Sequence, residues 1–406
     1  MVGKRMLDVQ KIRGDFPILS SGIIYLDNAA SSLTPDPVID KMLAFYHEYR
    51  ANVERGVHRL SRKASDELAA TRARICKFIN AASEAEVIFT KNTTESINLV
   101  ARGLGWKKGD KVVTTLLEHH SNLIVWQRLR RLGVEVNIIR PNVEGIFNLR
   151  DFEEAIDDKT KLVALTHISN VLGTLLPVEK ISELAREHDA EVLIDAAQSA
   201  PHMAINIKTL GCDYLAFSGH KMLGPTGVGV LYAREDKHCT LEPLCIGGGS
   251  IEEVTLDGYK LAKSPARFEA GTPPIAEVIG LGAAVDYLTK IGFDAIAEHE
   301  KSLVRSLHRG LVEIPKVEVY GPTDVEQRVG IVPFNVKGLN PHDIAAILDN
   351  SANIMVRSGH HCAMPLHKEL LGQPEGTVRA SVYIYNTLEE IKKLVDTVRE
   401  ISESLV

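Results

Sequence analysis

Short apolar segments that alternate with amphipathic helical patterns are the feature that most restricts how this chain can fold. They continue through the first two-thirds of its 406 residues. Strands separated by helices indicate a mostly parallel sheet that helices cover on both faces. Ligands bind beyond the carboxyl ends of the strands in such a sheet, so residues that follow a strand are the first candidates for a site. The predicted strands are 86–90, 111–115, 134–139, 161–166, 191–194, 213–217 and 227–232, with helices over 94–103 and 178–188.

The pattern changes after about residue 290, where a long helical pattern and two short strand patterns follow each other. A chain of this length is too long for one small core. We therefore expect an α/β fold in which a mostly parallel large domain is followed by a smaller α+β domain. The expected parts are an N-terminal segment 1–26 that packs with the small domain, a large domain 27–291 and a small domain 292–406. The small domain should contain a helix at 294–312, strands at 317–320 and 330–335, a helix at 341–350 and a closing helix after Leu388.

Charge and hydropathy exclude several classes of function. The net charge of −6 comes from acidic and basic residues mixed along the chain, which indicates no basic surface for a nucleic acid. No apolar run approaches the ~20 residues that span a bilayer. The start of the chain has no apolar segment of the kind found in secretory signals. We expect a cytoplasmic protein that binds neither nucleic acid nor membrane.

The five cysteines indicate neither a disulfide framework nor a zinc site, because their number is odd and no Cys-x-x-Cys occurs. Cys76 in a helical pattern and Cys212 before an apolar strand are expected to be buried small hydrophobic residues, the usual fate of a free cysteine. Cys362 differs, because it follows two histidines and lies near Arg357 in the run RSGHHCAMP. Such a cationic setting favours the reactive thiolate. A structural loop cysteine or a Cys/His protease would also fit this segment, although no protease signature surrounds it.

A lysine follows the predicted strand 213–217, in the sequence Ser218-Gly219-His220-Lys221. Gly219 is expected to let the backbone turn at the end of the strand. Lys221 would then project at the edge of the sheet where ligands bind. A single loop lysine is usually a solvated charge, but three other clusters favour a ligand-binding role here.

The first cluster contains Asp195, which ends the apolar run EVLID and is predicted to be buried. A buried carboxylate needs a partner, since an unpaired buried charge is costly. The protonated ring nitrogen of pyridoxal phosphate (PLP) is such a partner, because an aspartate there keeps the ring able to withdraw electrons. Gln198 is close enough in the chain to reach another ring substituent, such as the phenolic oxygen. A helix cap at the strand end is the alternative explanation for Asp195.

The second cluster is the segment NTTE at 92–95, between a predicted strand and an apolar helix. Asn92 and Glu95 have the spacing of a capping box, so a helix should begin here. Its free backbone N–H groups would point at the edge of the sheet and form a ready phosphate site. Side chains that would add hydrogen-bond donors are those of Thr93, Thr94, Ser218 and His220.

The third cluster is the sequence EHHSN after the predicted strand 111–115. His119 or His120 could stack there on a flat cofactor ring. Adjacent histidines seldom bind one metal ion together, and no histidine–carboxylate helix motif is present. We therefore expect no metal site.

These segments together resemble one family, the Suf-type (group II) cysteine desulfurases among the class V aminotransferase-like PLP enzymes of fold type I. The resemblance covers nearly the whole chain. The run at 357–366 discriminates most, because a short loop with its cysteine just after paired histidines marks group II. Departures are small: Ser358 stands where threonine is common, and the frequent proline after EHHSN is absent. The matching segments are YLDNAA (25–30), ERGVHRLS (54–61), TKNTTESINLVA (90–101), EHHSN (118–122), THISNVLGT (166–174), DAAQ (195–198), SGHKMLGPTGVG (218–229), RFEAGTP (267–273) and RSGHHCAMPL (357–366).

The resemblance implies a role for each candidate residue. Lys221 would bind the cofactor covalently and move the substrate's α-proton, His119 would stack on the ring, and Cys362 would attack the substrate sulfur. Asp195 would pair with the ring nitrogen and Gln198 with the ring oxygen. The phosphate would be held by Thr93, Thr94, Ser218 and His220, and by Thr272 of a neighbouring subunit. The substrate site would comprise Asn170 and Arg379, which would hold the carboxylate, with Arg357, His58 and Ala29.

The implied reaction takes sulfur from L-cysteine, releases L-alanine and leaves a persulfide on Cys362 for iron–sulfur cluster assembly or other sulfur transfer. The resemblance also implies PLP as the cofactor, a homodimer and a scaffold or other protein that accepts the sulfur. A nucleophile must take the substrate's sulfur, so the presence of both Lys221 and Cys362 indicates this reaction more specifically than either residue alone. Selenocysteine lyase activity is the closest alternative. Transamination or kynurenine cleavage would need no nucleophilic cysteine, and a non-catalytic sulfur-relay subunit would be expected to lack Lys221 or Asp195.

Overall fold

A computed structural model describes residues 7–54 and 56–404 of the chain. Its largest element is a seven-stranded sheet with the strand order β2-β8-β7-β6-β5-β3-β4. The pairs from β4 to β7 are all parallel, whereas β8 is antiparallel to both of its neighbours. The prediction of a mostly parallel sheet is therefore confirmed. The strands are β2 (Val87–Thr90), β3 (Lys111–Thr115), β4 (Glu135–Ile139), β5 (Thr160–Thr166), β6 (Glu191–Asp195), β7 (Tyr214–Ser218) and β8 (Gly229–Ala233).

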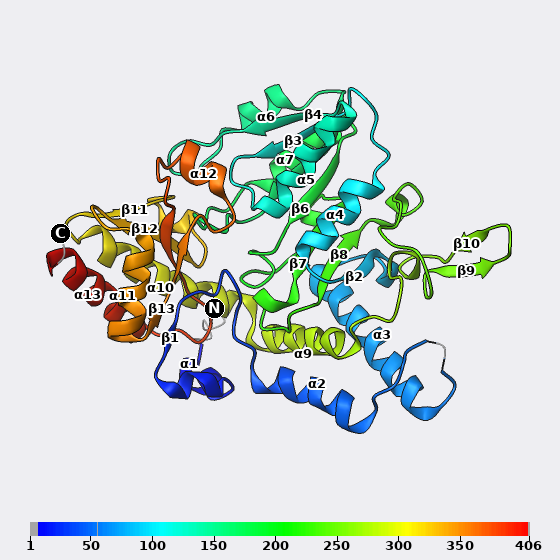
Figure 1. Cartoon of the computed structure of the whole chain (residues 1–406), viewed down its shortest axis with the longest axis horizontal. Coiled ribbons are helices and arrows are strands. Elements are labelled where there is room, and N and C mark those ends of the chain that lie inside the picture. The colour runs from blue at the N-terminus through cyan, green and yellow to red at the C-terminus, as the bar shows by residue number, and fades with distance from the viewer. Residues whose placement is uncertain (1–6, 55, 405–406) are drawn as a thin grey trace, which may run out of the picture.

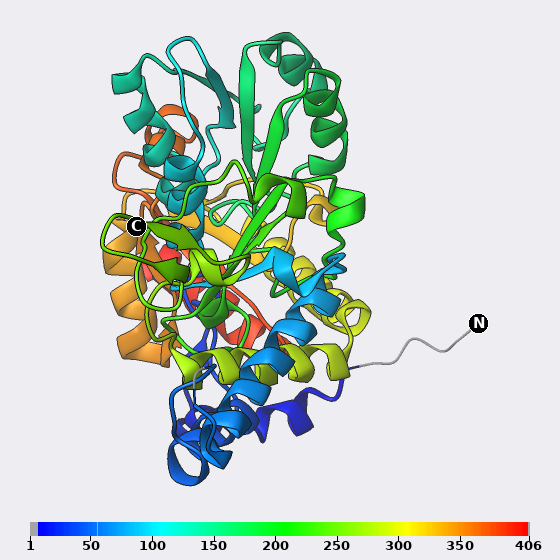
Figure 2. The ribbon, with the colours of Figure 1, turned by 90° about the vertical axis from the view of Figure 1, so that its right-hand side faces the viewer.

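Both faces of this sheet are buried, because successive side chains of a strand enter two different cores. Val87 and Phe89 belong to the larger core, while Ile88 between them belongs to the smaller one. Figure 2 shows helices on either side of the sheet. The smaller core is closed by α4 (Thr93–Gly103) and α5 (Ile124–Leu129). The larger core is closed by α2 (Asp36–Glu48), α3 (Arg59–Ile79), α6 (Leu149–Ala155), α7 (Val178–Glu187), α8 (Ile207–Leu210) and α9 (Ile275–Ile291).

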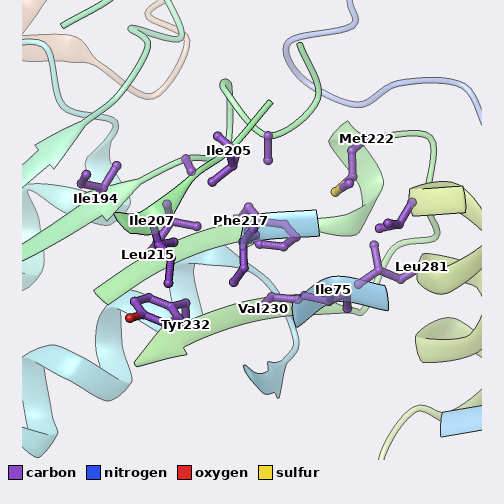
Figure 3. Close-up of a cluster of buried hydrophobic side chains, with 14 of the residues drawn as sticks. Ile75, Ile194, Ile205, Ile207, Leu215, Phe217, Met222, Val230, Tyr232 and Leu281 are labelled. Carbon is purple, nitrogen blue, oxygen red and sulfur yellow. The ribbon is translucent and has the colours of Figure 1, made fainter. Parts of the chain in front are cut away.

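The larger core supports the end of β7, the strand that leads to residues 218–221. Figure 3 shows Phe217 of β7 and Val230 of β8 among side chains that include Ile75 of α3 and Leu281 of α9. All four side chains are fully buried. Burying a side chain of this kind contributes ~1.5–3 kcal/mol. The strand end that carries the candidate lysine is therefore held by a rigid, well-packed environment.

The C-terminal part contains a second, antiparallel sheet with the order β11-β12-β15-β14. Figure 1 shows it beside its helices at the left of the molecule, away from the large sheet. It has its own hydrophobic core, to which the helices contribute Leu303, Leu348 and Leu394. Its elements are α10 (Phe293–Val312), β11 (Val317–Val319), β12 (Ile331–Val336), α11 (Pro341–Ala352), β14 (Arg357–Gly359), α12 (Met364–Glu369), β15 (Thr377–Ser381) and α13 (Leu388–Ser404).

The N-terminal segment packs against this C-terminal part. The short strand β1 (Ile24–Tyr25) pairs in parallel with β13 (Ile354–Met355), and Ile24 belongs to the C-terminal core. In the short helix α1 (Val9–Arg13), Arg13 forms an ion pair of 2.7 Å with Glu390 of α13. Residues 1–6 of the expected segment lie outside the described residues.

A hairpin of β9 (Ile251–Val254) and β10 (Tyr259–Leu261) projects from the large sheet's side of the molecule, at the right in Figure 1. It exposes the apolar side chains of Val254, Leu256 and Tyr259. In the described part of the chain, none of the helices combines the length and the apolar character that a bilayer span requires.

One expectation about the cysteines is wrong. Cys212 is buried, as expected, but Cys76 is only half-buried. Cys76 lies in the last turn of α3, at the margin of the larger core, where its Sγ donates to the carbonyl oxygen of Ala81 at 3.6 Å.

Candidate active site

A cavity with about 790 Å³ of empty space lies at the carboxyl ends of the parallel strands. This space includes the mouth of the cavity, which is open to solvent. Residues that directly follow β2, β3, β5, β6 and β7 line it, because parallel strands bring their carboxyl ends to one edge. Of the residues predicted for the site, the cavity brings together Ala29, Thr93, Thr94, His119, Asn170, Asp195, Gln198, Ser218, His220, Lys221, Arg357 and Arg379.

Lys221 lies in a single 3₁₀ turn directly after β7. Burial lowers the pKa of its amine to about 8, although the nearby carboxylate of Asp195 acts in the opposite direction. The explanation expected for Gly219 is wrong, because its φ is not in the left-handed region. A Cβ at residue 219 would instead lie 3.0 Å from the carbonyl oxygen of Pro225. Close packing of the Lys221 turn against the following loop is therefore what requires a glycine.

Asp195 ends β6, and the backbone N–H of Ala197 donates to its Oδ1 at 2.9 Å. Burial raises the pKa of its carboxyl group, and the charge of Lys221 opposes this effect. Gln198 donates through Nε2 to the carbonyl oxygen of Ala29 at 2.7 Å. Its Oε1 is buried and has no partner among the residues that the structure describes. The side chains of Asp195 and Gln198 thus both line the cavity and can form further hydrogen bonds there.

The start of α4 supplies the expected N-terminal arrangement. Asn92 is the N-cap, and its Oδ1 accepts from the backbone N–H of Glu95 at 3.0 Å. The backbone N–H and the hydroxyl group of Thr93 both lie within 2.8 Å of the Ser218 Oγ. Gly229 allows this approach, because a Cβ there would lie 2.6 Å from the Cα of Asn92. Hydroxyl groups and helix N–H groups are therefore gathered at one end of the cavity, the arrangement that suits an anion.

His119 lies at the cavity in a neutral form. Burial and the positive charge of Lys221 lower the pKa of its imidazole to about 3. Its Nδ1 lies 3.1 Å from the backbone nitrogen and 3.0 Å from the Oγ of Ser121. Ser121 also contacts the Oγ1 of Thr94 at 2.7 Å. The ring is thus fixed in orientation by the turn that follows it.

Arg379 is fully buried on β15. Its Nη2 donates to Asp27 Oδ1 at 2.9 Å and its Nη1 to the carbonyl oxygen of Asn170 at 2.8 Å. Burial lowers the pKa of this guanidinium to about 10, and Asp27 acts against that shift. The Nε of Arg379 and the Oδ1 of Asn170 are buried without a partner. A planar cation with an unused donor suits a carboxylate ligand.

Cys362 does not line the cavity, but it contacts a residue that does. Its Sγ lies 3.8 Å from Nη2 of Arg357. The sulfur is close enough for its charge to act on the pKa of both Lys221 and Arg379. Cys362, far from residue 221 in the chain, thus lies next to a residue of the cavity that Lys221 lines.

Two further predicted residues also lie outside this cavity. Thr272 is exposed, four residues after the 3₁₀ turn that ends at Phe268. His58 is exposed and forms the N-cap of α3, where its Nδ1 accepts from the backbone N–H of Ser61 at 3.3 Å. A role for Thr272 at the phosphate of a neighbouring subunit and a role for His58 in substrate binding both stay predictions.

Sequence reasoning missed three residues that shape the site. Asp27 lies in the segment YLDNAA, which was noted without a role for the aspartate. Ser121 lies in EHHSN, where only the histidines were considered as site residues. Glu118 is fully buried before His119, and its carboxyl group accepts from Thr115, Asn122 and Thr166. Asp27 reaches Arg379, Ser121 reaches Thr94 and Glu118 reaches Thr166 across the fold, and no local pattern could have indicated these contacts.

The residues present fit PLP, the cofactor that the sequence resemblance implies. An amine, a buried carboxylate and an unpartnered amide oxygen face one cavity, and a helix start with hydroxyl groups closes one end. In PLP, the amine would react with the aldehyde, the carboxylate would pair with the ring nitrogen, the amide would lie at the ring oxygen and the helix start would bind the phosphate. No group of three or more His, Cys, Asp or Glu side chains within residues 7–54 and 56–404 is arranged to hold a metal ion.

Comparison with known proteins places the chain among PLP enzymes. The family model described as "Aminotransferase class-V" matches residues 24–394. A relative from Pyrococcus abyssi named "Probable cysteine desulfurase" is 48% identical over 400 residues, which cover 98% of each chain. The solved apo structure of a cysteine desulfurase from Thermococcus onnurineus NA1 has a TM-score of 0.94 and 49% identity, covering 99% of this chain and 100% of that one. A mutant of C-DES with glycine covalently linked to its PLP cofactor has a TM-score of 0.83 and 25% identity, covering 96% and 99% of the two chains.

Proposed function

This chain belongs to the class V aminotransferase family and is a PLP-dependent cysteine desulfurase, and we propose that Cys362 is the residue that receives the sulfur. The observation that supports the proposal is that Lys221 and Arg379 line one cavity, while Cys362 contacts Arg357, another residue of its lining. Lys221, Arg379 and Cys362 each supply a different requirement of the reaction: an amine, a carboxylate-binding cation and a sulfur nucleophile.

PLP, when bound, supplies a ring that withdraws the electron pair left on the substrate's α-carbon. Lys221 is the residue that would bind the cofactor covalently. Its pKa of about 8 leaves a large share of the amine neutral near pH 7–8, which suits both a nucleophile and a base for the α-proton. Asp195 and Gln198 would hold the ring, and Thr93, Thr94, Ser218 and His220 would hold the phosphate.

His119 would lie against the cofactor ring as a neutral imidazole. Its pKa of about 3 keeps the ring uncharged over the working range of most enzymes. A neutral side chain there adds no second positive charge beside Lys221, and it can pass a proton without first losing one. The contacts with Ser121 keep the imidazole in place.

Arg379 and Asn170 would bind the carboxylate of L-cysteine. The Nε of Arg379 is a buried donor without a partner among the described residues, and Nδ2 of Asn170 uses one of its two hydrogens on the carbonyl oxygen of His361. The unused Nε–H of Arg379 can donate to a carboxylate oxygen, and a second donor can come from the Nδ2 group of Asn170 or from Arg357. Ala29 would limit the space beside the substrate, and His58 is a further candidate for substrate binding, although it lies outside the cavity.

Cys362 would attack the sulfur of the bound substrate as a thiolate. A new S–S bond forms, the substrate's C–S bond breaks, and the electron pair of that bond goes to the β-carbon, which takes up a proton. L-Cysteine and the Cys362 thiol thus become L-alanine and a Cys362 persulfide, with no other oxidant or reductant. Nη2 of Arg357 lies 3.8 Å from this sulfur and can donate a hydrogen bond to it.

Replacing Cys362 with alanine tests this assignment. The variant should keep the absorbance of bound PLP but should not form sulfide or alanine from L-cysteine with a reductant. Cys239, which is exposed, offers the matched control, because its replacement should leave turnover unchanged. Undiminished turnover in the Cys362 variant would refute the assignment and favour a class V reaction that needs no nucleophilic cysteine. Selenocysteine as an alternative substrate is decided by steady-state rates on both amino acids.

A homodimer is also part of the proposal. The hairpin residues Val254, Leu256 and Tyr259 and several residues of α2 expose large apolar side chains. Such exposure is unusual on a monomer and indicates a protein interface. A second copy would bring Thr272 to the phosphate of its neighbour. Light scattering of the purified protein would decide this point, and a monomeric mass would contradict it.

Several finer assignments rest on the sequence alone. We assign the chain to the Suf-type (group II) branch because of the short loop that carries Cys362, and we divide it into parts 1–26, 27–291 and 292–406. Transfer of the sulfur to an acceptor protein, its use in iron–sulfur cluster assembly and a cytoplasmic location stay predictions. The interactions of the purified protein with candidate acceptors would test the first of these.

A further inference from the structure

The loop that carries Cys362 has an unusual backbone. His361 and Cys362 have φ angles of 49° and 58°, so two consecutive residues other than glycine adopt the left-handed conformation. Each such residue is strained, and the conformation persists only where the surroundings hold it. The contacts of this loop with the rest of the molecule should therefore determine where the thiol points.

Three hydrogen bonds join the loop to the large sheet's side of the site. Asn170 donates through Nδ2 to the carbonyl oxygen of His361 at 2.7 Å. The backbone N–H of His120 donates to the carbonyl oxygen of Cys362 at 2.7 Å. The backbone N–H of Met364 donates to Nε2 of the His120 imidazole at 3.0 Å. His120 thus contacts the loop twice, at the carbonyl group of Cys362 and two residues later at the backbone of Met364.

We propose that His120 is a positioning residue that docks the Cys362 loop against the large sheet and so directs the thiol toward the substrate. This inference rests on the proposed role of Cys362. His120 follows His119, so the same turn holds a ring at the cofactor and the loop of the nucleophile. The two histidines of EHHSN thereby have different roles: His119 lies at the cofactor site, and His120 holds the loop that carries the thiol.

The imidazole of His120 is suited to accept this bond. Nε2 can accept only while it carries no proton, and both burial and nearby His360 lower the pKa of the ring. The other histidines near the loop are used within the C-terminal part: His360 contacts the carbonyl oxygen of Pro374 at 2.7 Å, and His361 that of Thr377 at 3.0 Å. Of the histidines in and around this loop, His120 is therefore the one whose side chain connects it to the large sheet.

His120→Ala and His120→Gln separate the docking role from a general loss of structure. Alanine removes the acceptor, whereas the glutamine side chain can place Oε1 near the position of Nε2. His360→Ala is the matched control, because it removes a neighbouring imidazole without breaking a bond to the large sheet. All variants should be studied as PLP-loaded enzyme, and the PLP absorbance should be unchanged.

We expect His120→Ala to lower kcat for L-cysteine by about 10- to 100-fold, the effect of misplacing a reacting group by ~1 Å. KM should change by less than about 2-fold, because Arg379 and Asn170 remain intact. Hydrogen–deuterium exchange of the peptide containing Met364 should be faster, because its N–H loses an acceptor. His120→Gln should restore most of kcat and most of the protection, and His360→Ala should resemble the unmodified enzyme.

The inference is overturned if His120→Ala keeps its kcat and the protection of Met364, if glutamine is no better than alanine, or if His360→Ala causes an equal loss. The exchange measurement is independent of activity. An active Cys362→Ala enzyme would refute the proposed function, while the exchange rates would still decide whether His120 holds the loop.

Discussion

The buried ion pair between Arg72 and Glu269 provides a direct test of what anchors the segment that leads to Thr272. Two parallel hydrogen bonds of 2.8 Å join the guanidinium on α3 to the carboxylate, and the side chains are only 9% and 11% exposed. The backbone N–H of Phe89 on β2 donates to the same carboxylate at 2.6 Å. One pair thus connects a helix, the edge of the sheet and the loop at 266–273.

Arg72→Met would leave the carboxylate of Glu269 buried with one backbone donor. Removing one partner of a buried ion pair costs ~3–5 kcal/mol, because the remaining charge is uncompensated. The double variant Arg72→Met with Glu269→Gln should be more stable than Arg72→Met by ~2 kcal/mol, because the charge is removed while an acceptor for Phe89 remains.

Urea unfolding followed by tryptophan fluorescence measures these effects. The chain has two tryptophans, Trp106 and Trp126, and both pack in the smaller core of the large sheet. Arg74→Met is the matched control, because Arg74 on the same helix pairs with Asp286 at 2.9 Å in an exposed position. Such a pair contributes ~0–1 kcal/mol. A loss below ~1 kcal/mol for Arg72→Met, or a further loss on adding Glu269→Gln, would refute this reasoning.

Two further predictions concern the site. Arg379→Lys should raise KM for L-cysteine by about 10-fold or more, because lysine cannot keep the bonds to Asp27 and Asn170 while binding a carboxylate. Steady-state kinetics would check this, with Asp27→Asn as a milder comparison. A KM within 2-fold of the original would contradict the prediction. In enzyme freed of PLP, the rate at which Lys221 captures the cofactor should rise with pH and level off above about 8, because the neutral amine is the nucleophile and its pKa is lowered by burial. Stopped-flow absorbance would follow it. Asp195→Asn should shift this plateau to lower pH, because the Asp195 charge raises the pKa, whereas a rate that rises up to the ordinary lysine pKa of ~10.4 would show that Lys221 is not perturbed.

The local sequence determined the large sheet and the edge at which the site lies. Strand and helix patterns have short periods, so apolar residues every second or every third to fourth position report the elements directly. The predicted strands agree with the structure to within two residues at their ends. Because parallel strands end at one edge, the positions of Lys221, Asp195, Thr93 and His119 at one cavity followed from the chain order.

The resemblance to a family supplied what the local patterns could not. Arg357 and Arg379 follow no strand pattern that marks them as site residues, yet both line the cavity. Asn170 follows the strand at 161–166, but only the resemblance singled it out. Burial of Arg379 could not be read from its neighbours, since a charged residue in a strand is usually exposed. Its position depends on the C-terminal sheet packing beside the large one.

Only the tertiary structure decided which polar groups form hydrogen bonds with one another. Asp27 reaches Arg379 across 352 positions of the chain, and His120 reaches Met364 across 244. The reason for Gly219, close packing against the loop at Pro225, likewise became visible only in three dimensions. A short-period pattern reports which side of an element is buried but not what lies against it, because that depends on how distant elements pack. The fold and the edge that carries the site were therefore set by local sequence, and the direction of the thiol by long-range contacts.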